Sequence, residues 1–169
     1  MFVKHIYIPL FRAYKSNLGL SERLVAKRLH RERWLFWKGE SLSVLRRTAL
    51  YPNVQNKYAL LEKLMTQHNK NLDDLKYLTE VHHGVPDFLC YRQGHFKFVE
   101  CKSGHEQLSA IQKICILKLM RLGYEVEVHI LARACTKTRI ALINLETGEK
   151  KILERQLSLR QFQKRCATC

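Results

Sequence analysis

The chain has 169 residues, with 30 Lys and Arg against 15 Asp and Glu, which gives a formal net charge of +15. This length predicts one domain, residues 1–169, that is large enough to bury a core. The positive charge favours a polyanion as partner. No apolar run is long enough to cross a membrane as a helix, which excludes a helical membrane protein.

The cysteines and the first residues predict where the protein works. Six cysteines occur, and three of them fall in predicted apolar elements, as small core residues do. We expect no secretory signal, because the first apolar run is soon broken by Pro9 and Arg12. Cys166 and Cys169 have metal-ligand spacing, but no second pair accompanies them, so a frayed tail is the better interpretation. These features predict an intracellular protein of the cytoplasm, nucleoid, nucleus or an infected host cell.

The first part of the chain predicts strand, helix, strand. Residues 2–8 and residues 33–38 are short apolar runs, the second rich in aromatic residues. Between them we expect a helix with Ser21 as its N-cap that continues to about Glu32. Its apolar face consists of Leu24, Val25, Ala26 and Leu29.

Basic residues line the other side of this expected helix. We predict that Lys27, Arg28 and Arg31 contact nucleic-acid phosphates as a set. For any single one of them, a solvated helix face is the more common explanation.

Residues 41–80 predict a helical insertion. A helix is expected from Pro52 to about Asn69, and a shorter one over residues 72–78. The insertion could shape the substrate site, but additional cover for the core is the better explanation.

The clearest pattern in the chain is a β-hairpin. Apolar runs over residues 85–91 and 96–102 flank a polar, glycine-containing turn. Alternation puts four residues of the second run on one face and three on the other. The first face carries Phe96, Phe98, Glu100 and Lys102, and the second carries Lys97, Val99 and Cys101. With Asp87 entering from the neighbouring strand, two carboxylates and one ammonium converge.

This trio suits metal-assisted phosphodiester cleavage. Asp87 and Glu100 can supply the carboxylates that Mg²⁺ or Mn²⁺ prefers. Lys102 can hold the attacking water and offset the charge that builds on the phosphate. The alternative is a half-buried salt bridge between Lys102 and one carboxylate, and the trio alone does not separate the two.

The residues after Lys102 predict a crossover helix and further strands. A helix is expected from about Glu106 to Leu122, then a strand over residues 124–131, an order typical of α/β folds. The expected apolar stripe of this helix is Leu108, Ile111, Cys115, Leu119 and Leu122.

Gln112 lies on the apolar side of this helix. A buried amide should face a polar group, so we expect it to point at the active site or a nearby phosphate; the alternative is a surface glutamine at the helix edge. Beyond it, residues 133–169 predict a hairpin of two short strands and a basic helix.

These motifs together resemble one family. The run from Gly84 to Leu89 (GVPDFL), the run from Phe98 to Gly104 (FVECKSG), and the later Leu108-Ser109, Gln112 and Leu119 to Val128 resemble the VRR-NUC domain. That domain is one branch of the restriction-endonuclease-like nucleases. It is also the last domain of the Fanconi-associated nuclease. The likeness extends from about His83 to Leu131, and Cys101 departs from the family's usual valine.

The resemblance implies a fold and a fuller site. It implies an α/β, restriction-endonuclease-like core, a mixed central sheet flanked by helices, formed by about residues 20–40 and 81–132. It implies that Asp87, Glu100, Lys102 and Gln112 are catalytic and that the main-chain carbonyl of Cys101 is a further metal ligand.

A glutamate before the first strand of this core commonly completes the family's metal site. Glu22 is in that position, while Glu62, in the insertion, is the weaker competitor. Glu22 could also serve simply as a first-turn carboxylate. His83, next to the Pro-Asp motif, is a further candidate for a phosphate contact.

The function that the resemblance implies is a metal-dependent DNA endonuclease. Relatives of this kind act on branched DNA, four-way junctions or flaps, in repair and recombination, and stand-alone domains do so as homodimers. Two alternatives stay open: a non-catalytic DNA-binding module of the same fold, and a nonspecific DNA or RNA nuclease.

Overall fold

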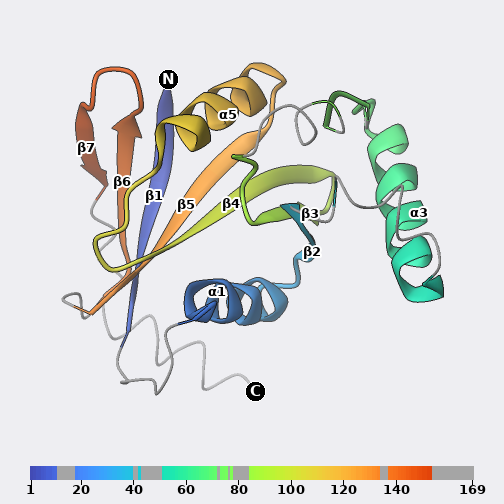
Figure 1. Cartoon of the computed structure of the whole chain (residues 1–169), viewed down its shortest axis with the longest axis horizontal. Helices are drawn as coiled ribbons and strands as arrows, with labels where there is room; N and C mark the ends of the chain where they lie inside the picture. The colour runs from blue at the N-terminus through green and yellow to red at the C-terminus, as the bar shows by residue number, and fades with distance from the viewer. Residues whose placement is uncertain are drawn as a thin grey trace.

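The computed structural model describes residues 1–10, 18–39, 42, 51–71, 73–75, 77, 84–133 and 137–153. Its elements, shown in Figure 1, are β1 (Phe2–Pro9), α1 (Leu20–Arg31), β2 (Leu35–Lys38), α3 (Pro52–Gln67), β3 (Phe88–Arg92), β4 (His95–Ser103), α5 (Ala110–Arg121), β5 (Glu125–Ala132), β6 (Arg139–Asn144) and β7 (Lys150–Leu153). No helix in these ranges is long and apolar enough to span a bilayer.

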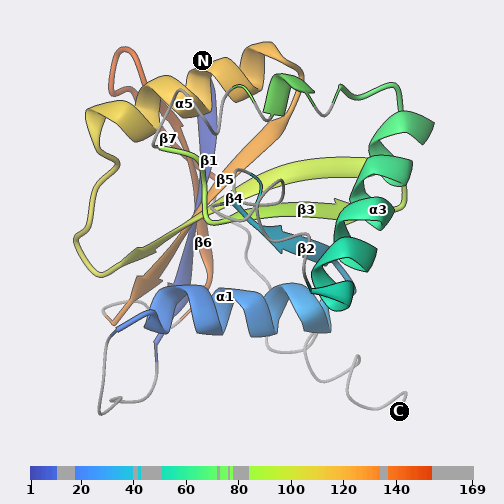
Figure 2. The ribbon, with the colours of Figure 1, turned by 45° about the vertical axis from the view of Figure 1, so that its right-hand side comes forward.

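All seven strands form one mixed sheet in the order β2-β3-β4-β5-β1-β6-β7. β5 pairs in parallel with β4 and β1, and the other neighbours are antiparallel. The parallel β4–β5 pair requires a crossover, which α5 supplies. Helix α5 covers one face of the sheet and α1 covers the opposite face (Figure 2). The predicted α/β fold, a mixed sheet flanked by helices and consistent with a restriction-endonuclease-like core, is confirmed.

Strand β1 lies inside the sheet, between β5 and β6. The core expected at residues 20–40 and 81–132 therefore continues into residues 2–9, and β6 and β7 extend it at the other side. Val3 is fully buried and Ile6 nearly so. The sequence predicted this strand but not its place, because its partners lie more than a hundred residues away.

Helix α1 begins earlier than expected. Its N-cap is Gly19, in a left-handed conformation with φ of 59°, so the prediction of Ser21 as N-cap was wrong. The earlier start places Leu20 in the helix, where it is buried with Val25 and Leu29. Burial of this additional leucine explains why the helix begins before Ser21, although serine is the better capping residue.

The predicted hairpin is confirmed, and so is the facing of its second strand. Arg92 pairs with His95, and the two turn residues, Gln93 and Gly94, have φ values of 50° and 82°, as a type I′ turn requires. Alternation sends Phe96 and Phe98 into the cluster under α5, and Val99 and Cys101 into the cluster under α1. The side of the hairpin that carries Glu100 and Lys102 is thus the α5 side.

Helix α5 begins at Ala110, four residues later than expected. Ser109 and Gln112 form a capping box that starts the helix at this point. Two members of the predicted apolar stripe face solvent: Ile111 is 54% exposed and Leu122 is 39% exposed. The core face consists of Cys115, Ile116 and Leu119, which is the set at helical spacing from the true first turn.

Helix α3 confirms the first of the two helices predicted for residues 41–80. It stands beside the hairpin at the β2 side of the sheet (Figure 1), where Leu61 and Met65 are buried in the core under α5. The indole N–H of Trp37 in β2 donates to the carbonyl of Lys57 at 2.9 Å. These contacts support the view that the insertion covers the core. His83, the expected basic C-terminal helix and the pair Cys166 and Cys169 lie outside the described residues.

Gly39, directly after β2, lies against the backbone of the segment before β3. Its N–H donates to the carbonyl of Asp87 at 2.8 Å. A Cβ at this position would lie 1.9 Å from the carbonyl oxygen of Pro86, which is backbone and cannot rotate away.

We therefore expect Gly39→Ala to lower the free energy of unfolding by about 3 kcal/mol or more, measured by urea denaturation. Gly148→Ala is the control, because a Cβ there meets nothing within 4 Å although φ is +74°. That substitution should cost only the backbone strain of about 1–2 kcal/mol. Equal losses in the two variants would contradict the close approach at Gly39.

Candidate active site

Asp87 is held against β4 at the point where β3 begins. Its Oδ2 accepts the backbone N–H of Cys101 at 2.6 Å, a bond that crosses from one hairpin strand to the other. Cys101 turns its side chain to the α1 side, so its backbone, flanked by Glu100 and Lys102, lies beside the aspartate. The hairpin thus brings the predicted trio together.

Glu100, Lys102 and Gln112 form a closed set of contacts. The Lys102 ammonium lies 2.9 Å from Oε1 of Glu100 and donates to Oε1 of Gln112 at 3.0 Å. The Gln112 amide donates in turn to Oε1 of Glu100 at 2.6 Å. The expectation that Gln112 points into this cluster is confirmed; it is not a glutamine at the surface edge.

The capping box of α5 fixes the orientation of Gln112. Its Oε1 also accepts the backbone N–H of Ser109 at 3.0 Å, while the Ser109 hydroxyl accepts the N–H of Gln112 at 3.2 Å. The side chain that starts the helix is therefore also the one that contacts Glu100 and Lys102. Helix α5 cannot shift along the sheet without disturbing this cluster.

Burial and nearby negative charge raise the pKa of both carboxylates, Asp87 and Glu100. Burial first, and the nearby charge of Asp87 second, raise the pKa of Glu100 to about 7, although Lys102 opposes the change. Burial also raises the pKa of Asp87, and the charge of Glu22 adds to this effect. The salt bridge between Lys102 and Glu100 exists, but one ammonium does not compensate both the buried carboxylate of Glu100 and the half-buried carboxylate of Asp87. A further positive charge at this point would be favourable.

The donor set fits a hard cation such as Mg²⁺. Asp87 and Glu100 could supply carboxylate oxygens to such an ion, and the adjoining backbone of Cys101 could supply a carbonyl. Within the described part of the chain, no three His, Cys, Asp or Glu side chains are grouped closely enough to hold a metal ion by themselves. Mg²⁺ commonly binds through one or two carboxylates with water and substrate phosphate completing its shell, so two carboxylates suffice.

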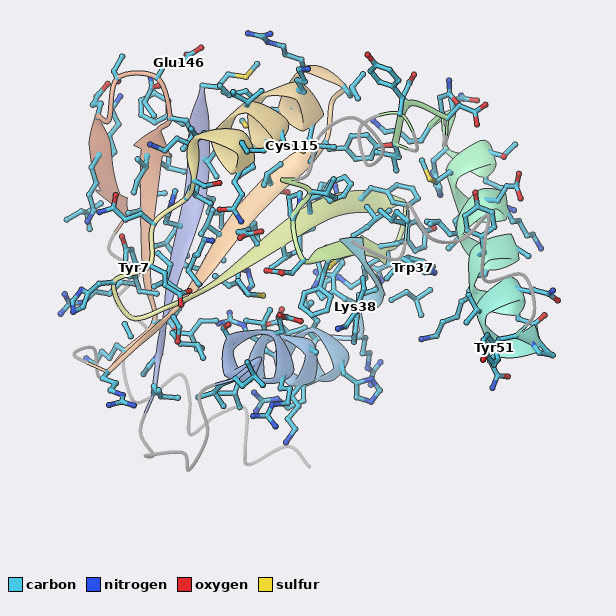
Figure 3. All side chains as sticks on the ribbon, viewed as in Figure 1. Tyr7, Trp37, Lys38, Tyr51, Cys115 and Glu146 are labelled. Atoms are coloured by element: carbon cyan, nitrogen blue, oxygen red, sulfur yellow. The ribbon has the colours of Figure 1, made fainter. Side chains whose placement is uncertain are left out.

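Glu22 lies at the border of this cluster. It is in the first turn of α1 and pairs with the ammonium of Lys38 at 3.5 Å, with 39% of its side chain exposed. Figure 3 places Lys38 at the end of β2 beside α1. The charge of Glu22 contributes to the raised pKa of Asp87, and the role of Glu22 as a metal ligand stays a prediction. Glu62 is exposed on α3.

The residues of α1 that are predicted to contact phosphate differ in their exposure to solvent. Lys27 and Arg31 are exposed, and so is Arg23 one turn before Lys27. Arg28 is partly buried and donates to the Glu32 carboxylate at 2.8 Å. The exposed basic face of α1 is therefore Arg23, Lys27 and Arg31.

A second buried charge cluster, on the α1 side of the sheet, had no signal in the sequence. Glu127 accepts from Lys97 at 2.6 Å and from His129 at 3.0 Å, and also from Lys4 of β1. Burial alone would raise the pKa of Glu127, but the bond from His129 and the charge of Lys97 hold it far below the ordinary value. Such a cluster could be found only by knowing that β1, β4 and β5 are neighbours.

Comparison with known proteins identifies one family. The model of the VRR-NUC domain matches residues 23–130, from α1 through most of β5. The match includes Asp87, Glu100, Lys102 and Gln112, and leaves β1, β6 and β7 outside. No match was found among curated proteins.

The raised pKa of Glu100 predicts a pH dependence of stability. Because the folded protein holds this proton more tightly than the unfolded chain between the ordinary value of 4.5 and about 7, the free energy of unfolding should fall as pH rises through that window. The loss due to Glu100 is at most about 3 kcal/mol. The measurement is urea unfolding in EDTA across this pH range, comparing the wild type with Glu100→Gln.

Glu100→Gln has no proton to lose here, so its stability should exceed that of the wild type by an increasing margin as pH rises. Comparing the two proteins cancels the opposite contribution of His129, whose pKa burial lowers. Parallel pH profiles would contradict the assignment.

Proposed function

Because the chain belongs to the VRR-NUC domain family, which implies nuclease-type processing of DNA, we propose that it is a metal-dependent endonuclease that cleaves branched DNA. The observation that carries the proposal is the closed contact of Glu100, Lys102 and Gln112 beside Asp87. Two neighbouring carboxylates whose negative charge is offset by only one ammonium favour a bound cation, and such a cation assists phosphodiester hydrolysis.

Different residues of the chain have different roles in this hydrolysis. Asp87, Glu100 and the Cys101 carbonyl would hold Mg²⁺ or Mn²⁺, with Glu22 as a further candidate. When bound, the ion supplies positive charge to the phosphate and acidifies a water. The ammonium of Lys102 has three N–H donors, and its contacts to Glu100 and Gln112 occupy two. The third can orient the attacking water, while Gln112 keeps the ammonium in place.

The proposed substrate is branched DNA, a four-way junction or a flap, inside a cell. The net charge of +15 supports a polyanionic substrate, and the exposed Lys27 and Arg31 of α1 support contacts to its backbone. The preference for branches and the assembly as a homodimer come from the likeness to relatives.

The second candidate is a DNA-binding module of the same fold that does not cut, and the intact cluster argues against it. Supercoiled plasmid in Mg²⁺ or EDTA separates the two, because only the enzyme nicks it and only with the metal. A panel of duplex, flap, splayed and four-way junction DNA and of RNA, in Mg²⁺ and in Mn²⁺, then tests the substrate.

The first substitutions separate chemistry from binding. Asp87→Ala and Lys102→Ala should abolish cleavage of the preferred substrate and leave DNA affinity in EDTA nearly unchanged, since basic residues elsewhere make most phosphate contacts. Lys63→Ala, an exposed lysine of α3, is the control for loss of one charge. Cleavage by either site variant at near wild-type rate in Mg²⁺ would refute the assignment.

Substitution of two glutamates tests which of them belongs to the active site. We expect Glu22→Gln to lower the cleavage rate at least about tenfold, or about 1.4 kcal/mol of barrier, with little change in DNA affinity. Glu62→Gln should leave the rate unchanged, because Glu62 is exposed on α3. The reverse result would move the additional acidic residue to the insertion.

A further inference from the structure

A cavity of about 350 Å³ opens at the opposite end of β3 from Asp87. It is lined by Glu32, Arg33, Leu35, Tyr91, Arg92 and Gln93. Strand β3 separates the two places by four residues, or about 13 Å at about 3.3 Å per residue. Strand β2 is the edge strand of the sheet, so no other strand in the described part of the chain pairs beyond it at the cavity.

The lining has the chemistry of a nucleotide site. Two guanidinium groups, from Arg33 and Arg92, can take a phosphate. The side chain of Leu35, which is 46% exposed, gives an apolar surface against which a base can pack. Tyr91 lines the cavity as well, but its ring packs on Phe96 with centroids 4.8 Å apart, and its hydroxyl lies 3.1 Å from His68. The amide of Gln93 can bond to the edge of a base.

Arg92 is already held in place within this lining. Its guanidinium lies 4.4 Å from the centroid of the Trp34 ring and donates to the carbonyl of Glu32 at 3.0 Å. These contacts reduce the entropy that a bound phosphate would otherwise have to overcome. They also counter the negative end of the α1 dipole, which ends at Arg31.

The backbone points to a function for the other two polar residues. In the described ranges, three non-glycine residues have positive φ: Arg33 at 60°, Asn69 at 52° and Gln93 at 50°. Asparagine tolerates this conformation, but arginine and glutamine do so poorly. After a helix and at the first position of a type I′ turn, glycine or asparagine would cost less. Both strained residues line the same cavity, and strain of this kind concentrates at functional sites.

The exposed basic face of α1 connects the two places. Arg23, Lys27 and Arg31 are exposed and follow one another at intervals of four residues, or about 6 Å along the helix axis. Their row begins beside Glu22, at the catalytic cluster, and ends beside Glu32, at the cavity. A strand that leaves the cluster along α1 meets a cation at each turn.

We infer that this cavity binds an unpaired nucleotide of the DNA strand that occupies the active site. The inference rests on the proposed function and specifies its substrate: branched DNA with a single-stranded segment reaching from the cluster to the cavity. Arg33 and Arg92 hold the phosphate, Leu35 packs on the base, and Gln93 contacts its edge. Fully paired DNA offers no such base.

The test measures binding of a fluorescein-labelled single-stranded oligonucleotide and of a blunt duplex of equal length, by anisotropy in EDTA. Arg33→Gly and Gln93→Asn should each weaken binding of the single strand about fivefold to tenfold, as loss of one base or phosphate contact does. Duplex affinity should change less. Because both substitutions relieve left-handed strain, the melting temperature should stay equal or rise.

Arg139→Ala, which removes an exposed arginine on β6, is the matched control and should leave the preference for the single strand unchanged. If Arg33→Gly does not fold, Gln93→Asn decides alone, because asparagine suits its turn. Wild-type affinity for the single strand in the folded variants would overturn the inference.

Cleavage of plasmid by the wild type in Mg²⁺ is scored separately from this binding. Metal-dependent cleavage combined with unaltered binding by the variants rejects the cavity and keeps the enzyme. Weakened binding by the variants, without any cleavage by the wild type, keeps the cavity and rejects the enzyme.

Discussion

The side chain of Gln112 is the constraint on which the site depends. It joins β4 to α5 through Glu100 and Lys102, and it joins α5 to its own N-cap through Ser109. The backbone of this same first turn also lies against Gly84, where a Cβ would come within 2.9 Å of the Gln112 nitrogen. The segment that leads to Asp87, the strand that carries Glu100 and the crossover helix therefore meet around one residue.

Two glutamates show how the sheet treats buried charge on its two faces. Glu100 and Glu127 are almost equally buried, with side chains 4% and 3% exposed. Glu127 has Lys97, Lys4 and His129 around it, and its pKa is held low. Glu100 has one ammonium and a second carboxylate beside it, and its pKa is raised. Because the two side chains are equally buried, the charges of their neighbours decide the difference. The negative charge of Glu127 is compensated by its basic neighbours, whereas that of Glu100 is not and favours a further cation.

The strands outside the family match contribute to this balance. Lys4 of β1 donates to Glu127 of β5, so the cluster on the α1 side is completed by a strand that the family match does not include. The two candidate sites lie at opposite ends of one strand. Asp87 contacts the backbone of Cys101 where β3 begins, and the cavity lies where β3 ends. Helix α1 covers the face of the sheet opposite α5 (Figure 2), and its residues Arg23, Lys27 and Arg31 are exposed.

Local patterns in the sequence were sufficient for the hairpin and for the trio. Alternation is a property of the strand itself, so the facing of Phe98, Glu100 and Lys102 followed without knowledge of any partner. The glycine-containing turn was also predicted, but that only Gln93 and Gly94 form it, with Arg92 paired to His95, is a finding of the structure. The helix starts were less predictable, because burial of Leu20 and the Ser109–Gln112 capping box, not the best single capping residue, decided where α1 and α5 begin.

The sequence by itself thus determined the hairpin, the facing of its charges and the family likeness that named the chemistry. Only the tertiary structure decided the place of β1, the Gln112 contacts, the opposite pKa shifts of the two glutamates and the cavity at the end of β3. The physical reason is distance along the chain. Lys4 and Glu127 are 123 positions apart in the sequence, and Arg92 and Glu32, whose carbonyl it contacts, are 60 positions apart. Contacts of this kind exist only once the sheet order is set, and charge compensation depends on them.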